Sequence, residues 1–291
     1  MRKKILITLL CILPLTVTAQ RDWSAIEIGV TELSDGIYRL FVNNSVAVVV
    51  SAGEDGLLVI DAAWEQSTDR LMEEIGKITD APVSYLINTH IHGDHTGGNK
   101  VVGKGATIIA HPAVREFLST EQRRGETIIP PFPESALPTL LVDDRKELQF
   151  NGEPVQIRHL PGGHTNSDLV IFFPTSNVLV LGDLLFADYF PFVDVSNGGN
   201  PIQFLENVSR IINDYPEDVT IVGGHGPVYS MKQLKKWHAD LSETFSTLQK
   251  AKEQGMTAEQ MKENRVLKQW EQMGSFFITE DRWIDTLYPF L

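Results

Sequence analysis

The stretch of sequence that decides the fold is His90-Ile91-His92-Gly93-Asp94-His95, which follows a run typical of a β-strand. It holds three imidazoles and one carboxylate, the mixture of neutral nitrogen and anionic oxygen ligands that metals such as zinc favour. The first two histidines are two residues apart on extended chain, so their side chains point the same way and can hold one ion. Gly93 allows a sharp turn that directs Asp94 and His95 elsewhere. We therefore predict a second ion beside the first.

Three later strands of the predicted fold also end in glycine-lined turns that carry a ligand type. The strand expected near residue 155 leads to His164, the strand near 178 ends at Asp183, and the strand near 219 ends at His225. Functional side chains of α/β proteins converge at the carboxyl ends of their strands. One such turn is weak evidence, but four of them together predict a single metal centre at one edge of the sheets.

These motifs occur in the order found in the metallo-β-lactamase-fold hydrolases, and the chain resembles that superfamily from about Gly36 to about Tyr229. The resemblance implies an α/β fold, the αββα sandwich of the metallo-β-lactamase type. Its motifs are highly specific for the fold and much less specific for the substrate, because one fold hosts many reactions. The segments that carry it are Thr89–Gly98, Gly163–Thr165, Gly182–Asp183, Gly224–Gly226 and, upstream, Gly56–Asp61.

The resemblance also implies which residues bind metal and how they act. Two zinc ions would share a water whose pKa falls to roughly 7, and the resulting hydroxide would attack a substrate carbonyl. Asp94 would orient this hydroxide and relay its proton to the leaving group. Iron or manganese are further options, because sites of this kind also accept them. By resemblance, His90, His92 and His164 hold the first metal, Asp94, His95 and His225 hold the second, and Asp183 bridges the two.

One departure from the resemblance bears on the substrate. Many β-lactamases of this fold place a cysteine where this chain has Asp183, and a lysine three residues later where it has Phe186. The aspartate makes the metal site similar to that of glyoxalase II and lactonases. We therefore expect cleavage of an ester, lactone, thioester or amide carbonyl. Hydrolysis of β-lactam antibiotics is the leading alternative, since the spacing from His164 to His225 still resembles the lactamases.

Two further alternatives remain open. Persulfide dioxygenases of the same superfamily use a single iron with similar residues, and in such an enzyme Asp94, His95 and His225 would have no metal. A metal-binding or partner-binding protein that kept the fold without catalysis is the other alternative. The complete set of seven ligands argues against that second option, because binding alone does not need a pair of metals that activates water.

Candidates for supporting roles are fewer and less specific. Asp61 ends a strand beside the metal loop and is expected to accept a hydrogen bond from a ligating imidazole. Phe186 and Tyr189 follow the bridging aspartate and are candidates for the pocket wall, and Tyr189 or Asn200 is a candidate to assist the oxyanion. Three other histidines are expected to be structural or exposed, namely His111, His159 and His238.

The amino-terminal segment has the pattern of a secretory signal peptide. Basic residues 2–4 precede an apolar run, Ile5 to Val17, and small residues follow at a cleavage site after Ala19. The run is shorter than the roughly 20 residues that span a bilayer. We expect residues 1–19 to be removed, leaving an exported protein, periplasmic or secreted, with no stable membrane insertion. Cys11, the only cysteine, would be lost with them.

Composition limits the partners and the organisation of the chain. The net charge of −13 argues against a nucleic-acid partner, which needs a basic face. A small-molecule substrate is expected, and the oligomeric state stays open. We predict one catalytic domain over residues 20–230 and a helical carboxy-terminal extension over residues 231–291 that packs on it. In that extension, Thr257 and Gln260 have the spacing of a capping box.

Overall fold

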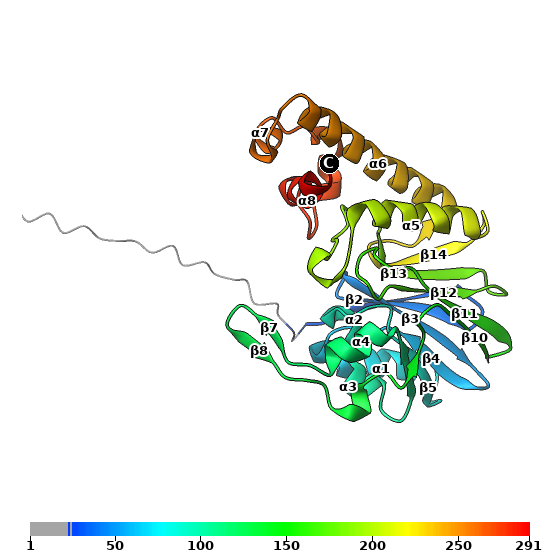
Figure 1. The fold of residues 1–291 in the computed structure, drawn as a ribbon. Coiled ribbons are helices and arrows are strands. Elements are labelled where there is room, and N and C mark those ends of the chain that lie inside the picture. Colours follow the sequence, from blue (N-terminus) through cyan, green and yellow to red (C-terminus); the bar gives the residue numbers. More distant parts are fainter. Residues whose placement is uncertain (1–22, 24) are drawn as a thin grey trace, which may run out of the picture.

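The computed structural model describes residue 23 and residues 25–291. The predicted signal peptide at residues 1–19 lies outside the described residues. In the described part, two β-sheets stack face to face and helices cover both outer faces (Figure 1). The αββα sandwich predicted from the sequence is confirmed, and so is the presence of a helical carboxy-terminal region.

The first sheet has seven strands in the order β1-β2-β3-β4-β5-β6-β9. Its first four strands form antiparallel hairpins, and the strands from β4 to β9 run parallel. The parallel strands end at one edge, so the loop that follows β5 emerges there. The bounds are β1 Ile28–Ser34, β2 Ile37–Val42, β3 Val46–Gly53, β4 Gly56–Ile60, β5 Val83–Ile87, β6 Thr107–Ala110 and β9 Leu140–Leu141.

The second sheet has six strands in the order β10 to β15. Its β13 and β14 are parallel neighbours, so the residues at their carboxyl ends lie side by side. A separate small hairpin, β7 Gln122–Arg124 with β8 Thr127–Ile129, extends from the first half of the chain (Figure 1). The bounds of the second sheet are β10 Arg145–Phe150, β11 Glu153–His159, β12 Leu169–Phe173, β13 Val178–Phe186, β14 Thr220–His225 and β15 Tyr229–Ser230.

Helices from the two halves of the chain cover opposite faces of the sandwich (Figure 1). Helices α1, α3 and α4 lie on the side of the first sheet, and α5 and α6 lie on the side of the second. The short helix α2 belongs to the metal loop. The bounds are α1 Thr68–Ile78, α2 Gly93–Thr96, α3 Asn99–Val102, α4 Pro112–Leu118, α5 Pro201–Asp214, α6 Met231–Glu253, α7 Ala258–Glu263 and α8 Glu280–Leu287.

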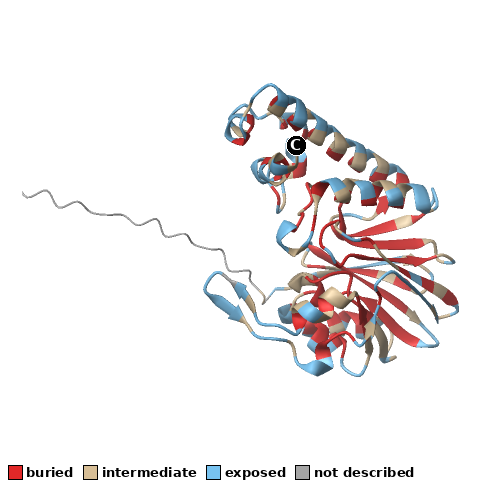
Figure 2. Ribbon diagram, in the orientation of Figure 1, coloured by how far each residue is buried: buried red, intermediate tan, exposed pale blue. Residues whose placement is uncertain are grey.

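The buried side chains form three main apolar clusters, which lie between the layers of the sandwich. Figure 2 shows that the strands of both sheets are largely buried. Between the sheets, Val49 and Ile60 of the first sheet pack with Ile171 and Val222 of the second. A second cluster lies between the first sheet and α1, and a third lies between the second sheet and the carboxy-terminal helices. Removal of this apolar surface from water stabilises the sandwich.

Most predicted elements are present, with shifted boundaries. The helix expected over residues 65–78 begins with a 3-10 turn, Glu65–Ser67, before α1. The helix expected over residues 204–212 begins earlier, because Asn200 caps it and proline occupies its first position. Strands β1 and β10 were not predicted from the sequence. Most of their residues are exposed, so these segments lack the alternation of apolar and polar residues that marks a half-buried strand.

The carboxy-terminal helices share a core with the second sheet. Trp283 of α8 is fully buried and stacks on Phe190, which follows β13, and Met261 of α7 belongs to the same cluster. The predicted capping box of Thr257 and Gln260 is present at the start of α7. The division of the chain at residue 230 stays a proposal. Among the described residues, no helix combines the length and the apolar character that crossing a membrane requires.

Candidate metal centre

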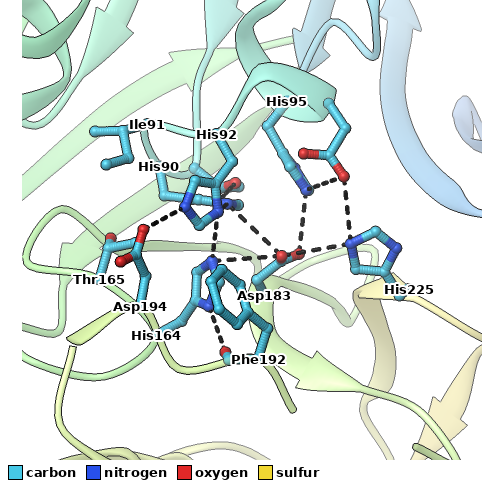
Figure 3. A network of polar contacts seen from close by, with 12 residues as sticks. His90, Ile91, His92, His95, His164, Thr165, Asp183, Phe192, Asp194 and His225 are labelled. Carbon is cyan, nitrogen blue, oxygen red and sulfur yellow. Dashed lines mark hydrogen bonds and ion pairs between the residues drawn. The ribbon is translucent and has the colours of Figure 1, made fainter. Parts of the chain in front are cut away.

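The structure brings all seven predicted ligands together at one edge of the sandwich, as the convergence of strand ends predicted (Figure 3). The ligand atoms of each group lie within 4.8 Å of one another. They come from the loop after β5, from the turn between β11 and β12, and from β13 and β14. His225 ends β14, whereas β13 continues for three residues beyond Asp183 instead of ending there as predicted. The first group is His90, His92, His164 and Asp183, and the second is Asp94, His95 and His225.

Asp183 lies between the two groups. Its Oδ2 is 3.4 Å from His164 Nε2 of the first group and 3.4 Å from His225 Nε2 of the second. Its Oδ1 is 3.1 Å from His95 Nε2. One carboxylate therefore faces imidazoles from both sides, which is the arrangement required of a bridging ligand.

The polar atoms of the site fit metal binding. His95 Nε2 and Asp183 Oδ1 are buried and lie 3.1 Å apart, but within the described residues neither atom makes a hydrogen bond of acceptable geometry. Buried polar atoms are rarely left unsatisfied, so each such atom calls for an explanation. His92 Nδ1 also approaches ring nitrogens of His90 and His164, at 3.1 and 2.9 Å. Nitrogen lone pairs that converge in this way, beside carboxylates, form the donor set that zinc prefers.

The histidine ring nitrogens that point away from Asp183 contact other polar groups. His164 Nδ1 contacts the carbonyl oxygen of Phe192 at 2.7 Å, and His225 Nδ1 contacts that of Ser45 at 2.7 Å. A ring nitrogen that donates to such an acceptor leaves the opposite nitrogen free to bind metal. His90 Nδ1 lies 3.0 Å from the Thr89 hydroxyl.

Two carboxylates hold the remaining two rings. Asp61 Oδ2 lies 2.7 Å from His95 Nδ1, as the sequence predicted for this residue, and Asp61 also accepts from the amide and hydroxyl of Thr89. Asp194 Oδ2 lies 2.8 Å from His92 Nε2. Asp194 was not predicted from the sequence, because 102 residues separate it from its partner. Each ligand group thus has one histidine held by a buried carboxylate.

Burial and neighbouring charges shift the pKa values of the site in opposite directions. Burial, with repulsion from other imidazoles, lowers the pKa of His90 well below its usual value and that of His164 to about 4. Burial acts the same way on His95, but the carboxylates of Asp183, Asp61 and Asp94 outweigh it and raise the pKa of His95 well above its usual value. A ring binds metal in its neutral form, so the carboxylates beside His95 oppose the loss of its proton that metal binding requires.

Two residues of the site are partly open to solvent. The Asp94 side chain is 24% exposed and that of His92 is 14% exposed, whereas Asp183 is only 4% exposed. A small molecule would therefore approach from the side of Asp94 and His92. Asp94 Oδ2 lies 3.6 Å from His225 Nε2.

The residues predicted to line the pocket or to assist the oxyanion differ in their positions. Phe186 is buried and stacks on the His225 ring, with centroids 4.8 Å apart, so it supports a ligand instead of lining a pocket. Asn200 uses its side-chain oxygen to cap α5, accepting from two amides, and its role toward an oxyanion stays a prediction. Tyr189 is half-buried and does line a cavity beside the site. Its ring lies 4.9 Å from that of Phe276, a residue of the carboxy-terminal extension.

The three other histidines lie outside the two metal-binding groups. His111 Nδ1 accepts from an amide and caps α4, and its ring stacks on His159 at 4.0 Å. His238 lies 3.0 Å from the carbonyl oxygen of Leu205. These positions agree with the structural roles expected from the sequence.

Comparison with known proteins gives one consistent result. The sequence profile described as "Metallo-beta-lactamase superfamily" matches residues 39–236. "Metallo-beta-lactamase type 2" of Bacteroides fragilis is 24% identical over 238 residues, which cover 77% of this chain and 90% of that protein. "Metallo-beta-lactamase IND-1" of Chryseobacterium indologenes is 26% identical over 172 residues, covering 58% of this chain and 67% of that protein.

A solved structure agrees in fold. The metallo-beta-lactamase from Pontibacter korlensis superposes with a TM-score of 0.62 at 18% identity, covering 74% of this chain and 99% of that one. This likeness concerns the architecture alone, whereas the profile match covers more than half of the sequence and includes all the predicted ligands. The chain therefore belongs to the metallo-β-lactamase superfamily and is a metal-dependent hydrolase of that superfamily.

Proposed function

We propose that the protein is an exported hydrolase with two zinc ions that cleaves an ester, lactone, thioester or amide carbonyl of a small molecule. The observation that carries this proposal is the position of Asp183, whose two oxygens face imidazoles of both ligand groups. A carboxylate between two groups of this composition supports a pair of ions over a single one. Iron or manganese in the same positions would leave these contacts unchanged.

The chain's own residues would divide the work as follows. His90, His92 and His164 would hold one ion and Asp94, His95 and His225 the other, with Asp183 between them. Bound there, the ions would supply a water of lowered pKa and polarise the carbonyl of the substrate.

Asp94 is the member of this set best placed to move a proton. It is the more exposed of the two carboxylates, so it borders the space that a substrate would enter. Its position at the start of α2 directs it toward His225 and away from the sealed interior of the site. We infer that Asp94 orients the attacking water and passes a proton to the leaving group.

Aromatic rings border the approach to the site. Phe192 stacks on His92 with centroids 5.6 Å apart, and Phe276 lies 5.7 Å from the ring of His225. Phe277, next in the chain, is half exposed and contacts Phe192 edge to face. Such a border favours a substrate with an apolar body beside the reacting carbonyl.

A second candidate is hydrolysis of β-lactams, and one observation favours it. The similar curated proteins from Bacteroides fragilis and Chryseobacterium indologenes are both named metallo-beta-lactamases. The residues Asp183 and Phe186, which stand where many lactamases of this fold carry cysteine and lysine, argue for the broader group of carbonyl substrates.

Turnover of three substrate classes tests the proposal. The zinc-loaded protein is given a chromogenic cephalosporin, a lactone and a thioester, with Asp94→Asn as the matched control. Cleavage of the lactone or thioester, lost in the control, supports the proposal. Cleavage of the cephalosporin would identify a β-lactamase, and two bound ions without any hydrolysis would favour a binding protein.

The proposed export has its own test. Expression of the full chain in a bacterial host, followed by fractionation and intact-mass measurement, would show a product that starts at residue 20 outside the cytoplasm. An uncleaved chain in the cytoplasm would overturn this part of the proposal.

A further inference from the structure

Arg39 of β2 is a buried cation next to the metal centre. Its residue is 8% exposed, and its guanidinium lies 3.8 Å from the centre of the Phe41 ring, two residues along the same strand. Its Nη2 donates to the carbonyl oxygen of Gly226, the residue that follows His225. The side chain therefore crosses from the first sheet to the turn that carries a ligand of the second group.

The charge of Arg39 has no acidic partner within residues 23 and 25–291. The hydrogen bond to Gly226 uses one of its five N–H donors, and its buried Nε has no partner at all. Acidic residues outnumber basic ones by 38 to 25 in this chain, so a carboxylate partner would be easy to supply. Burial lowers the pKa of Arg39 to about 10, which still leaves it charged at neutral pH. A buried charge without a counter-charge is costly unless something else pairs with it.

Arg39 opens onto a cavity of about 390 Å³. Aromatic rings wall this cavity on several sides, and one of them, Phe276, comes from the carboxy-terminal extension. The polar lining comes from the turn between β2 and β3 and from the turn after β14. The residues concerned are Arg39, Phe41, Asn44, Ser45, Tyr189, Gly226, Pro227 and Phe276.

The cavity adjoins the second ligand group. Ser45 accepts from His225 Nδ1 through its carbonyl oxygen, and the rings of Phe276 and His225 are 5.7 Å apart. A molecule whose reacting carbonyl lies at Asp94 and His225 could therefore extend one end into this cavity.

We propose that this cavity is a subsite for a carboxylate group of the substrate, with Arg39 as its cation and Phe276 as its outer wall. The inference rests on the proposed hydrolase function and names the class of its substrates: small carbonyl compounds that carry a carboxylate on an apolar body. A guanidinium suits this role because its planar donors match the two oxygens of a carboxylate.

Substitutions at Arg39 separate this role from a purely structural one. Arg39→Gln keeps a donor for the Gly226 carbonyl but removes the charge, and Arg39→Lys keeps both a charge and a donor. Lys104→Gln, on an exposed turn, is the matched control for the loss of one positive charge. The substrates are the mono-4-nitrophenyl ester of succinic acid and the same compound with its free acid methylated.

For Arg39→Gln we expect the KM of the free acid to rise about 10- to 100-fold, the range for loss of a hydrogen bond to a charged group. The KM of the methylated compound and the zinc content should stay within about twofold of those of the wild type, and Lys104→Gln should behave as the wild type. Equal rises for both compounds, or loss of zinc with equal loss of both activities, would show that Arg39 only positions His225 and would overturn the proposal.

A binding measurement decides the matter even if neither compound is hydrolysed or Arg39→Gln does not fold. The probe is phenylacetate, with phenylacetamide as its uncharged counterpart, added to the zinc-loaded protein. Arginine Nε–H signals are followed by nitrogen-15 NMR, and Arg39→Lys identifies the signal of Arg39. We expect phenylacetate to shift this signal and phenylacetamide to leave it unchanged. An unchanged signal with both probes would refute the subsite, whatever the outcome for the hydrolase proposal.

Discussion

We expect Asp61→Asn to weaken selectively the binding of the second of the two proposed metals. Asp61 is 2% exposed and accepts three hydrogen bonds, from the Thr89 amide at 2.8 Å, the Thr89 hydroxyl at 2.8 Å and His95 Nδ1 at 2.7 Å. Its backbone has a φ of +65°, a conformation that asparagine also adopts readily. The substitution therefore changes the charge and the donor pattern while leaving the backbone without new strain.

The size of the effect follows from these contacts. If the asparagine oxygen keeps the bond to the Thr89 amide, its NH₂ group faces His95 Nδ1 and favours the ring form with the proton on Nε2. That is the nitrogen that points to Asp183, so the lone pair needed by the metal is lost. Loss of a charged hydrogen bond is worth about 1.5–3 kcal/mol. We expect the Kd of the second ion to rise about 10- to 100-fold, the range for loss of a metal ligand's partner.

Zinc titration with a competing chelator measures both sites in one experiment. The matched control is Asp194→Asn, because Asp194 holds His92 of the first group in the same way, at 2.8 Å. Asp61→Asn should weaken one of the two resolved zinc-binding steps. Asp194→Asn should weaken the other step. Circular dichroism of both variants checks that the fold is kept.

Two results would refute this reasoning. If both variants weaken the same step, the two carboxylates do not serve different ions. If Asp61→Asn binds two zinc ions within twofold of the wild-type affinities, the contact with His95 does not orient a ligand, and the assignment of His95 to the second ion fails.

Three further perturbations probe other parts of the structure. Gly224→Ala should lower the zinc content below two ions per protein, because the added Cβ would lie 2.0 Å from Asp183 Oδ1. Metal analysis measures this content, and a value of two would contradict the bridging role of Asp183. Trp283→Ala should lower the free energy of unfolding in urea by about 3–5 kcal/mol, since the fully buried ring also donates to Thr244; a loss under 1 kcal/mol would mean that the extension adds little to the core. Burial, with the stacked imidazole beside it, lowers the pKa of His111 from 6.5 to about 4, so folding favours its neutral form and stability is lost as the pH falls from 6.5 toward 4. His111→Asn can cap α4 but does not titrate, so its melting temperature should fall less than that of the wild type between pH 6.5 and pH 4. Parallel plots of melting temperature against pH for the two proteins would contradict this.

The sequence predicted the ligands better than their surroundings. His90, His92 and Asp94 are close in the chain, and a ligand motif of that density is visible without a structure. Asp194 and Arg39 belong to no such motif, because each forms its hydrogen bond with a residue more than 100 positions away in the chain. Phe186 was misjudged as a pocket wall for the related reason that nearness in sequence to a ligand does not set the direction of a side chain.

The sequence alone determined the family, the αββα architecture and the seven residues of the proposed metal centre, because short motifs at strand ends carry the resemblance that implies them and local periodicity agrees with it. The tertiary structure decided which carboxylates orient the rings, that Phe276 of the carboxy-terminal extension borders the site, and that Arg39 lies beside it without an acidic partner. The physical reason is that these features arise from contacts between chain segments that only the packing of two sheets and their covering helices brings together.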